Sequence, residues 1–262
     1  TWALANSHRF AIDGYHLCSD TQCQVYSDPR QASASVREAI RATSGAVLRW
    51  EGEPIHAVYH ATNGGISASG EEAWAMDPLP YVRVEADGTQ AWRESTLLPL
   101  QSAEGVKALL QRRDGAYGAG HPRFRWIRSY SAGQLAQALA AAGKGNALPI
   151  RGSGQDRGPS GRVLALAIER DGGASSVVLR LDAIRRTLRR LPSTLFVLQP
   201  EGAGAWQFQG GGFGHGVGLS QAGAIDLAGR GWSAQRILQH YYPGTRLEPL
   251  RQAPPAPPVQ AP

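Results

Sequence analysis

Lysine, cysteine and methionine are scarce in this chain of 262 residues. Lysine occurs only at positions 107 and 144, cysteine only at Cys18 and Cys23, and methionine only at Met76. No apolar run approaches the 18 or so residues that a membrane-spanning helix needs, which excludes a span of that kind. Because the first residue is Thr1, we expect residues upstream of it in the translated protein, and any export signal would lie there.

Three nucleotide- and nucleic-acid-binding patterns are also missing. No register of the sequence satisfies the dinucleotide fingerprint Gly-x-Gly-x-x-Gly, and no Gly-Lys-Ser/Thr of a P-loop occurs. No basic cluster alternates with aromatic residues as single-strand binders require. The net charge of +6 and pI near 9.7, carried mostly by arginine, suit nucleic acid, a membrane surface or an anionic wall polymer, or no specific partner. We expect no nucleic acid partner.

Hydrophobic residues make up 42% of the chain, enough for one large or two small domains. Hairpin-like strand pairs and separate helical stretches predict an α+β fold, with mixed, largely antiparallel sheets and segregated helices. The strand-like segments are 46–50, 54–61, 163–170, 175–182 and 193–199. The helical segments are 30–43, 103–113, 131–143, 221–229 and 233–242. A further helix is expected from Asp182, its N-cap, through the arginine pairs Arg185-Arg186 and Arg189-Arg190. The arginine pairs indicate a solvated helix face, and residues 152–161 indicate a loop.

The stretch FQGGGFGHGVGLSQAGA, residues 208–224, concentrates seven glycines around one histidine. Glycine permits backbone conformations and close approaches that other residues do not. We interpret the stretch as a tight loop that leads into a helix capped by Ser220, where a polymer or another backbone comes close. GLSQA resembles a nucleophile elbow with Ala222 in place of the second glycine, which keeps a serine hydrolase as an alternative.

Two further segments carry polar side chains that suit a site. In AVYHATNGG, residues 57–65, His60 ends a strand and the chain then turns sharply at Asn63-Gly64-Gly65. In YHLCSDTQCQVY, residues 15–26, His16, Cys18 and Cys23 are candidate metal ligands, but no fourth ligand is evident. A single disulfide is the simpler interpretation in an exported protein.

Taken in order, these segments resemble the stage II sporulation protein D family, which includes the amidase enhancer LytB. The family's Cys-Gln-x-Tyr, Tyr-His-Ser-Thr-x-Gly-Gly and Gly-His-Gly-Val-Gly-Met-Ser-Gln stretches match CQVY (23–26), YHATNGG (59–65) and GHGVGLSQ (214–221). A Trp-Pro-Tyr segment, a Ser-Gly-Arg and a Tyr-Tyr-Pro-Gly-Thr match residues 74–82, 160–162 and 241–245. The resemblance covers most of residues 1–250, which we take as one main domain, with a helical insertion at about 86–150 and a disordered, proline-rich tail at 251–262.

The resemblance implies action on bacterial peptidoglycan. Members look like lytic transglycosylases that cut glycan strands without stem peptides, or act as enhancers of a wall amidase. A transglycosylase needs one carboxylic acid, which protonates the glycosidic oxygen and then deprotonates the sugar's 6-hydroxyl. We expect an exported protein of the periplasm or cell wall, with a saccharide cleft lined by Tyr59, His60, Thr62, Gly64, Gly65, Gly214, His215, Gly216, Ser220 and Gln221.

Two departures from the family pattern limit what is carried over. The family's catalytic glutamate precedes an Ala-Arg-Thr-Tyr-Ala-Leu stretch whose end looks like Thr1-Trp2-Ala3-Leu4, so we expect that glutamate upstream of Thr1. Glu71, Glu72 and Glu85 are the residues to test if the acid lies within the chain. Some members bind zinc through a histidine before the second cysteine, where this chain has Gln22. We therefore expect a Cys18–Cys23 disulfide and no cofactor.

Overall fold

The computed structural model describes residues 1–19, 23–24, 27–145, 150–170, 176–189, 191–202 and 204–250. The chain divides into two compact units. Among the described residues, 1–57 and 244–250 form one, which we call the terminal unit, and residues 58–243 form the other, the central unit. The proline-rich tail predicted at 251–262 lies outside the described residues.

The terminal unit is built on a three-stranded antiparallel sheet. Strand β1 (Ala46–Trp50) runs between β11 (Arg246–Pro249) and β2 (Glu53–Pro54). Its buried apolar side chains are Trp2, Val47, Leu48 and Ile55. Helix α1 (Trp2–Ala5) and two 3₁₀ turns (Ala11–Asp13 and Pro29–Gln31) precede α2 (Ala34–Ala42). The Ser33 hydroxyl caps α2 by accepting from the Val36 N–H, as a serine at the N-cap does.

The central unit contains two three-stranded antiparallel sheets. One has the order β4-β9-β8, from β4 (Arg125–Ser131), β9 (Ala205–Gly211) and β8 (Phe196–Glu201). The other has the order β5-β6-β7, from β5 (Ile150–Arg157), β6 (Val163–Arg170) and β7 (Val177–Arg180). The helices of this unit are α3 (Gln90–Glu94), α4 (Ala103–Leu110), α5 (Ala132–Ala141), α6 (Ala183–Thr187), α7 (Gln221–Gly229) and α8 (Ala234–Tyr241), with a 3₁₀ turn at Gly70–Glu72.

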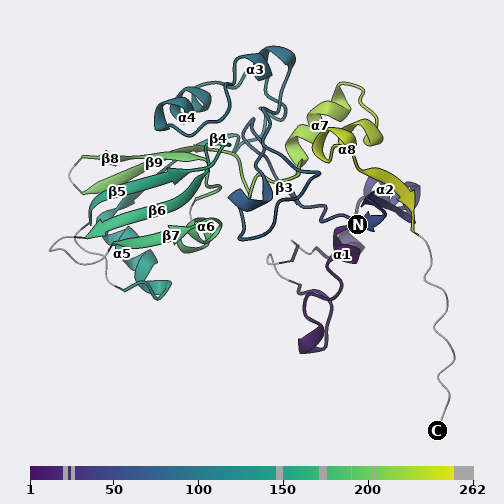
Figure 1. Ribbon diagram of the computed structural model, residues 1–262, viewed down its shortest axis with the longest axis horizontal. Helices are drawn as coiled ribbons and strands as arrows, with labels where there is room; N and C mark the ends of the chain where they lie inside the picture. The colour runs from purple at the N-terminus through teal and green to yellow at the C-terminus, as the bar shows by residue number, and fades with distance from the viewer. Residues whose placement is uncertain are drawn as a thin grey trace, which may run out of the picture. The chain divides into compact units, whose positions relative to one another are not determined.

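The β4-β9-β8 sheet separates two hydrophobic clusters, because successive side chains of a strand point to opposite faces. Phe196 packs with Phe208 and with side chains of β6, β7, α5 and α6. Leu195 and Val197 pack instead with Trp92 and with α4. Figure 1 shows α3 and α4 on one side of this sheet and the β5-β6-β7 sheet on the other. Segregated helices and mostly antiparallel sheets confirm the predicted α+β class.

Three local predictions differ from the structure. Residues 152–161 were expected to be a loop, yet 152–157 belong to β5, which pairs with β6 through register shifts at both ends. The strand expected at 54–61 is divided, because β2 pairs with β1 whereas β3 (Tyr59–His60) pairs with β10 (Leu219–Ser220). Asp182 precedes α6 but makes no capping bond. Its carboxylate binds two arginines instead.

Cys18 and Cys23 form a disulfide, with Cα atoms 5.7 Å apart. Oxidised sulfurs do not offer the thiolates that zinc binds, so these residues do not fit the zinc site of some family members. The remaining candidate, His16, has Nδ1 2.5 Å from the carbonyl oxygen of Ser7. Within the described ranges, no three His, Cys, Asp or Glu side chains are grouped to hold a metal ion.

Protein purified without a chelator is expected to contain neither stoichiometric zinc nor free thiols. The closed loop is short, so reduction should lower the free energy of unfolding by only about 2 kcal/mol, the low end of the usual range for disulfides. Metal analysis and thiol titration under denaturing conditions check the first two expectations. One zinc per chain together with two free thiols would contradict them.

Candidate functional site

The structure brings together the two segments that the sequence singles out. Strands β3 and β10 pair in parallel, with Tyr59 opposite Leu219 and His60 opposite Ser220. Further along, Thr62 pairs with Phe213 in an isolated bridge. Residues 212–218, which we call the glycine loop, therefore lie beside YHATNGG although about 150 residues separate them in the chain.

Both ring nitrogens of His215 are engaged. Nε2 lies 2.9 Å from the carbonyl oxygen of Tyr59, and Nδ1 lies 3.1 Å from the backbone nitrogen of Val217. A carbonyl oxygen accepts and a backbone N–H donates, so the hydrogen sits on Nε2 and Nδ1 is the acceptor. His215 is thus fixed as a neutral imidazole that ties β3 to the glycine loop.

His60 is buried beside His215, with ring centroids 5.2 Å apart. Its Nδ1 lies 3.1 Å from the carbonyl oxygen of Val217 and donates to it, which leaves Nε2 as an acceptor. This Nε2 is buried and has no hydrogen-bond partner among the described residues. Burial, then the neighbouring His215 and Arg162, hold the pKa of His60 well below its usual value.

An aromatic ring covers His215. The indole of Trp74 lies 4.7 Å from the imidazole, centroid to centroid, and both side chains are half-buried. Burial and the nearby Arg185 lower the pKa of His215 to about 4. At neutral pH this part of the surface therefore presents an indole, a neutral imidazole and the Tyr59 side chain, which is 40% exposed.

The low pKa of His215 predicts a loss of stability in acid. Between pH 4 and about 6.5 the unfolded chain binds a proton at this histidine and the folded protein does not, so the free energy of unfolding falls as pH decreases through that window. We expect His215 to account for a fall of roughly 1–2 kcal/mol in the free energy of unfolding between pH 7 and 4.8, allowing for its partial exposure. Urea unfolding at the two pH values, for wild type and His215→Gln, measures this term. An equal pH effect in both proteins would contradict it.

The glycines of the loop make room for the protein's own atoms. A Cβ at Gly214 would lie 2.6 Å from the Cβ of His60, and one at Gly216 would meet the guanidinium of Arg162. A Cβ at Gly64 would lie 2.8 Å from the backbone nitrogen of Gly212. The sequence predicted that either a polymer or another part of the backbone comes close to these glycines. In the structure, backbone and side-chain atoms of the protein itself lie close to them.

Behind the loop lies a buried polar network. Arg162 is fully buried and donates from Nη1 and Nη2 to the carbonyl oxygen of Ile66, from Nη2 to that of Asn63, and from Nη1 to the Ser160 hydroxyl. That hydroxyl donates in turn to Glu72 Oε1 at 2.7 Å, and Glu72 is itself buried. Burial lowers the pKa of Arg162 to about 10 although Glu72 opposes the shift. The Ser-Gly-Arg motif thus supports the NGG turn and the loop from within.

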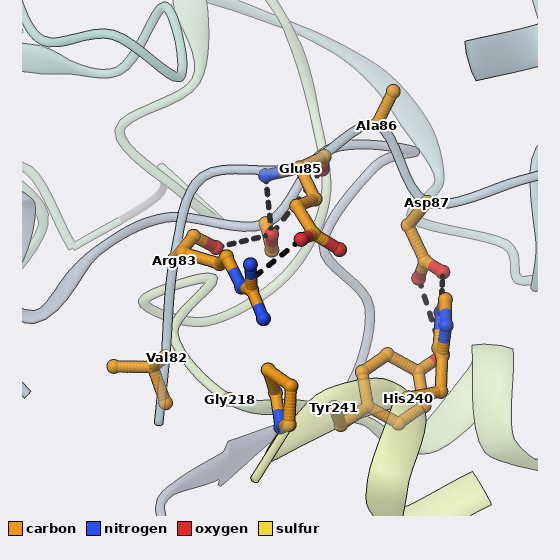
Figure 2. Close-up of a pocket in the computed structure, with 10 residues that line it drawn as sticks. Val82, Arg83, Glu85, Ala86, Asp87, Gly218, His240 and Tyr241 are labelled. Atoms are coloured by element: carbon orange, nitrogen blue, oxygen red, sulfur yellow. Dashed lines mark hydrogen bonds and ion pairs between the residues drawn. The ribbon is translucent and has the colours of Figure 1, made fainter. Parts of the chain in front are cut away.

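A second buried carboxylate holds the NGG turn from another side. Asp87 accepts from Asn63 Nδ2 at 2.6 Å, from His240 Nε2 at 2.8 Å and from the Tyr241 hydroxyl at 3.1 Å. Figure 2 shows Asp87 facing His240 and Tyr241 at the edge of a small cavity. Its volume of about 20 Å³ admits a water molecule but not a sugar ring. This cluster is therefore a structural clamp between the turn and α8.

Arg125 supports the same turn by capping a helix. Its guanidinium donates to the carbonyl oxygens of Leu109, Leu110 and Arg112 at the C-terminus of α4, and also to that of Gly64. The negative end of the helix dipole favours a cation there. Burial and the neighbouring arginines at positions 113 and 112 lower the pKa of Arg125 to about 9.

The predicted cleft residues divide into buried and exposed sets. Gln221 and Tyr59 are exposed, and Gly214 and His215 are half-buried. The remaining residues are buried: His60, Thr62, Gly64, Gly65, Gly216 and Ser220. Ser220 has 0% exposure and caps α7 by accepting from the Gly223 N–H. A nucleophilic serine must be exposed at its turn, so this burial excludes the serine-hydrolase alternative.

Sequence reasoning did not find several residues that meet at this surface. Asp182 and Arg185 come from α6 and its N-terminal end, where the arginine pair was interpreted as a solvated face. The Arg185 side chain is only 23% exposed and Asp182 only 12%. Trp74 was noted for its place in the family pattern, not for contact with His215. Helical spacing places Arg185 on a helix but does not reveal that this side of α6 packs next to the glycine loop.

Comparison with known proteins gives matches over nearly all of the chain. The family model described as domain of unknown function DUF8618 matches residues 68–218, and the model for stage II sporulation protein matches residues 1–50. An amidase enhancer of Bacillus subtilis (strain 168) is 23% identical over 93% of this chain. Stage II sporulation protein D of Bacillus amyloliquefaciens is 26% identical over 88% of it. These matches confirm the resemblance that the motifs indicate.

The chain spans only part of each curated relative. It covers 36% of the amidase enhancer, and 59% of the Bacillus amyloliquefaciens protein. Stage II sporulation protein D of Bacillus subtilis (strain 168) is 24% identical over 81% of this chain, which covers 50% of that protein. None of the described helices is both long and apolar enough to cross a membrane.

Proposed function

Because the chain belongs to the family described as domain of unknown function DUF8618 and is related to stage II sporulation protein D and the amidase enhancer, we propose that it is an exported protein of the bacterial cell wall. In this proposal it binds the glycan strands of peptidoglycan and takes part in lytic transglycosylase-type cleavage of strands that lack stem peptides. The observation that carries the proposal is the meeting of YHATNGG and GHGVGLSQ at a surface that also holds Trp74.

The composition of that surface suits a sugar. Binding sites for small polar ligands combine aromatic faces with a few fixed polar groups. Here the Trp74 indole is held against His215, and His215 is itself fixed by two hydrogen bonds to the backbone. Tyr59 adds an exposed side chain. Groups whose positions are already fixed lose little freedom when a ligand binds, which favours affinity.

Of the carboxylates near this surface, Asp182 is bonded to two arginines, and Glu72 and Asp87 are buried and occupied by hydrogen bonds inside the protein. Burial alone would raise the pKa of Asp182, but Arg185 and Arg186 outweigh it and lower that pKa. Glu72 accepts hydrogen bonds from the backbone N–H groups of Ser69 and Ser160, and Asp87 accepts three from side chains. General acid catalysis needs a carboxyl group that is protonated and within reach of the glycosidic oxygen. We therefore assign the surface to glycan binding and not to proton transfer.

The proposal is tested with peptidoglycan from which an amidase has removed the stem peptides. Sedimentation with this material is expected for the wild type and weakened for Trp74→Ala, with unchanged thermal unfolding as the control. Mass spectrometry of products from this chain, and from a natural protein that carries it with its flanking residues, is expected to find 1,6-anhydro-muramyl ends for the longer protein. If neither protein binds the glycan or generates these ends, the proposal fails.

A second candidate function is enhancement of a wall amidase without cleavage of glycan. The match to the amidase enhancer over 93% of the chain favours it. An amidase assay on intact sacculi, with and without the chain, separates the two candidates. Faster release of stem peptides with no anhydro ends supports the enhancer, whereas anhydro ends with an unchanged amidase rate support the transglycosylase.

A further inference from the structure

The terminal unit contains a cavity of its own, with a volume of about 410 Å³. The end of β1, the turn that follows it and β11 supply its walls, and the lining residues are Arg49, Trp50, Glu51, Gly52, Gly244, Arg246 and Glu248. None of them belongs to the surface around Trp74 and His215. Pockets for small ligands usually measure about 300–1,000 Å³, so this cavity is large enough for such a ligand.

Two arginines line this cavity from neighbouring strands. Arg49 of β1 is the register partner of Arg246 of β11, and like charges directly opposite each other destabilise a sheet. Arg49 Nη1 donates to the carbonyl oxygen of Gly52 at 2.5 Å, whereas its Nε lies 3.8 Å from Glu248 Oε2, too far for a hydrogen bond. Arg246 is exposed and forms no ion pair with the residues that the structure describes. The cavity therefore holds two guanidinium groups and one loosely paired counter-charge between them.

The Trp50 indole gives the same cavity an apolar side. A Cβ at Gly244 would lie 2.5 Å from Cζ3 of this ring, so the ring packs directly on the Gly244 backbone. Only glycine leaves room for that contact, and the φ of +79° at Gly244 also favours glycine. Trp50 is half-buried, so part of its surface stays accessible while the ring is held in place.

A strained glutamate lies at the turn end of the cavity. Glu51 and Gly52 form the two-residue turn between β1 and β2, and both have positive φ, +49° and +89°. Asparagine followed by glycine is preferred in such a turn, and a glutamate is strained there because its Cβ crowds the backbone. Strain of this kind is concentrated at functional sites. Glu51 thus adds a negative charge at one end of the cavity, and Glu248 adds another two positions beyond Arg246.

This distribution of charge favours a ligand with a single carboxylate. Guanidinium groups bind carboxylates through paired, charge-assisted hydrogen bonds. A polymer with repeated negative charges, such as a phosphodiester or a glycan with a carboxylate on each muramic acid, would bring further anions close to Glu51 and Glu248. The end of a peptide has one terminal carboxylate, N–H groups that donate to a glutamate, and side chains that pack on an indole.

We propose that this cavity binds the C-terminal carboxylate of a peptide. Arg246 and Arg49 bind the carboxylate, Trp50 contacts the last side chains, and Glu51 accepts from N–H groups of the peptide. Capture of a terminal carboxylate is a recurring mode of peptide recognition. Protein C-termini and the stem peptides of the wall both supply this chemistry. The inference adds a second site in the terminal unit and goes beyond the proposed binding of glycan.

The test compares peptides that differ in the terminal carboxylate. Titration of the isotope-labelled chain is followed by NMR at the Trp50 indole N–H, assigned with Trp50→Phe, at about 0.15 M salt to screen long-range charge effects. The probes are acetyl-trialanine and diacetyl-lysyl-D-alanyl-D-alanine, each as the free acid and as the C-terminal amide. The free acid of the preferred peptide is expected to bind about tenfold or more tightly than its amide, the effect of one charge-assisted contact. Whether the D-alanyl or the L-alanyl acid binds more tightly distinguishes a wall peptide from a protein C-terminus.

The variants assign the preference to the arginine pair. Arg246→Gln is expected to remove the preference for the free acid. Arg41→Gln removes an equal charge from the same unit, at a side chain that is 68% exposed and lies outside the cavity, and is expected to retain the preference. Because each comparison is between two ligands on one protein, a change in overall stability does not imitate the result.

Three results overturn the inference: equal binding of acid and amide by the wild type, a preference that persists in Arg246→Gln, and no binding of any peptide by the folded protein. A shift of the Trp50 signal caused by amidase-treated glycan oligomers, and lost in Arg246→Gln, would assign the cavity to glycan and overturn it as well. All of them leave the proposed function standing, because that function is tested separately at Trp74.

Discussion

Replacing Arg162 with methionine is expected to lower the free energy of unfolding by about 3–5 kcal/mol, the usual cost of removing one partner of a buried charge network. Arg162 and Glu72 are both buried and are linked through the Ser160 hydroxyl. Without Arg162, the Glu72 carboxylate loses the nearby positive charge, and the carbonyl oxygens of Asn63 and Ile66 lose their donor. Denaturant unfolding followed by tryptophan fluorescence measures the change.

The double variant makes this prediction specific. Arg162→Met combined with Glu72→Gln removes both charges, and we expect it to be more stable than Arg162→Met alone because no unpaired charge stays buried. Arg186→Met, an exposed arginine in the same unit, should change stability by about 0.5 kcal/mol or less. A double variant no more stable than Arg162→Met alone would show that Glu72 does not depend on Arg162.

Gly218→Ala is expected to lower the free energy of unfolding by about 3 kcal/mol or more. It is also expected to disrupt the pairing of β3 with β10. Gly218 has a φ of +68°, a conformation that costs other residues about 1–2 kcal/mol. A Cβ there would also collide with the carbonyl oxygen of Val58, a backbone atom next to the start of β3. Because backbone atoms of a paired segment do not yield easily, the collision adds to the conformational cost.

Gly231 supplies the matched control. Its φ is +82°, and a Cβ there would meet no atom within 4 Å. Gly231→Ala should therefore incur only the conformational cost, about 1 kcal/mol. The difference between the two variants, measured by denaturant unfolding, isolates the close approach of Gly218 to Val58. Equal destabilisation by both variants would mean that the loop relaxes freely and that this approach is unimportant.

The structure explains why the segment 208–224 is rich in glycine. The sequence left open whether a polymer or another backbone comes close to it. The structure places His60, Arg162 and Val58 where side chains at Gly214, Gly216 and Gly218 would project. A substitution such as Gly216→Val would consequently act through the protein interior, and a loss of glycan binding by that variant would not locate the ligand. Trp74 and Arg185 are better positions for that purpose because both are partly exposed.

Local sequence was sufficient for much of the secondary structure and for the relationship to known families. Serines at positions 131, 220 and 233 cap α5, α7 and α8, and each cap is a contact between residues three apart. Motifs such as YHATNGG and GHGVGLSQ identified the resemblance because they retain their order along the chain. Helix caps and family motifs both lie within short segments, so they can be predicted directly from the sequence.

The candidate site, by contrast, is formed by contacts between residues that are far apart in the chain. His60 pairs with Ser220 across 160 positions, and Arg162 lies between Asn63 and Gly216, which are 99 and 54 positions away. Residues 152–157 form a strand because β6 supplies their partners, although their glycines and polar residues are typical of a loop. Arg185 looks like a solvated helix residue until the fold places Pro192 and Gly214 beside it. The sequence by itself determined the fold class, the resemblance to known proteins and most helices. Only the tertiary structure decided which polar groups are buried and paired and which are exposed, because burial and charge pairing depend on residues that folding alone brings together.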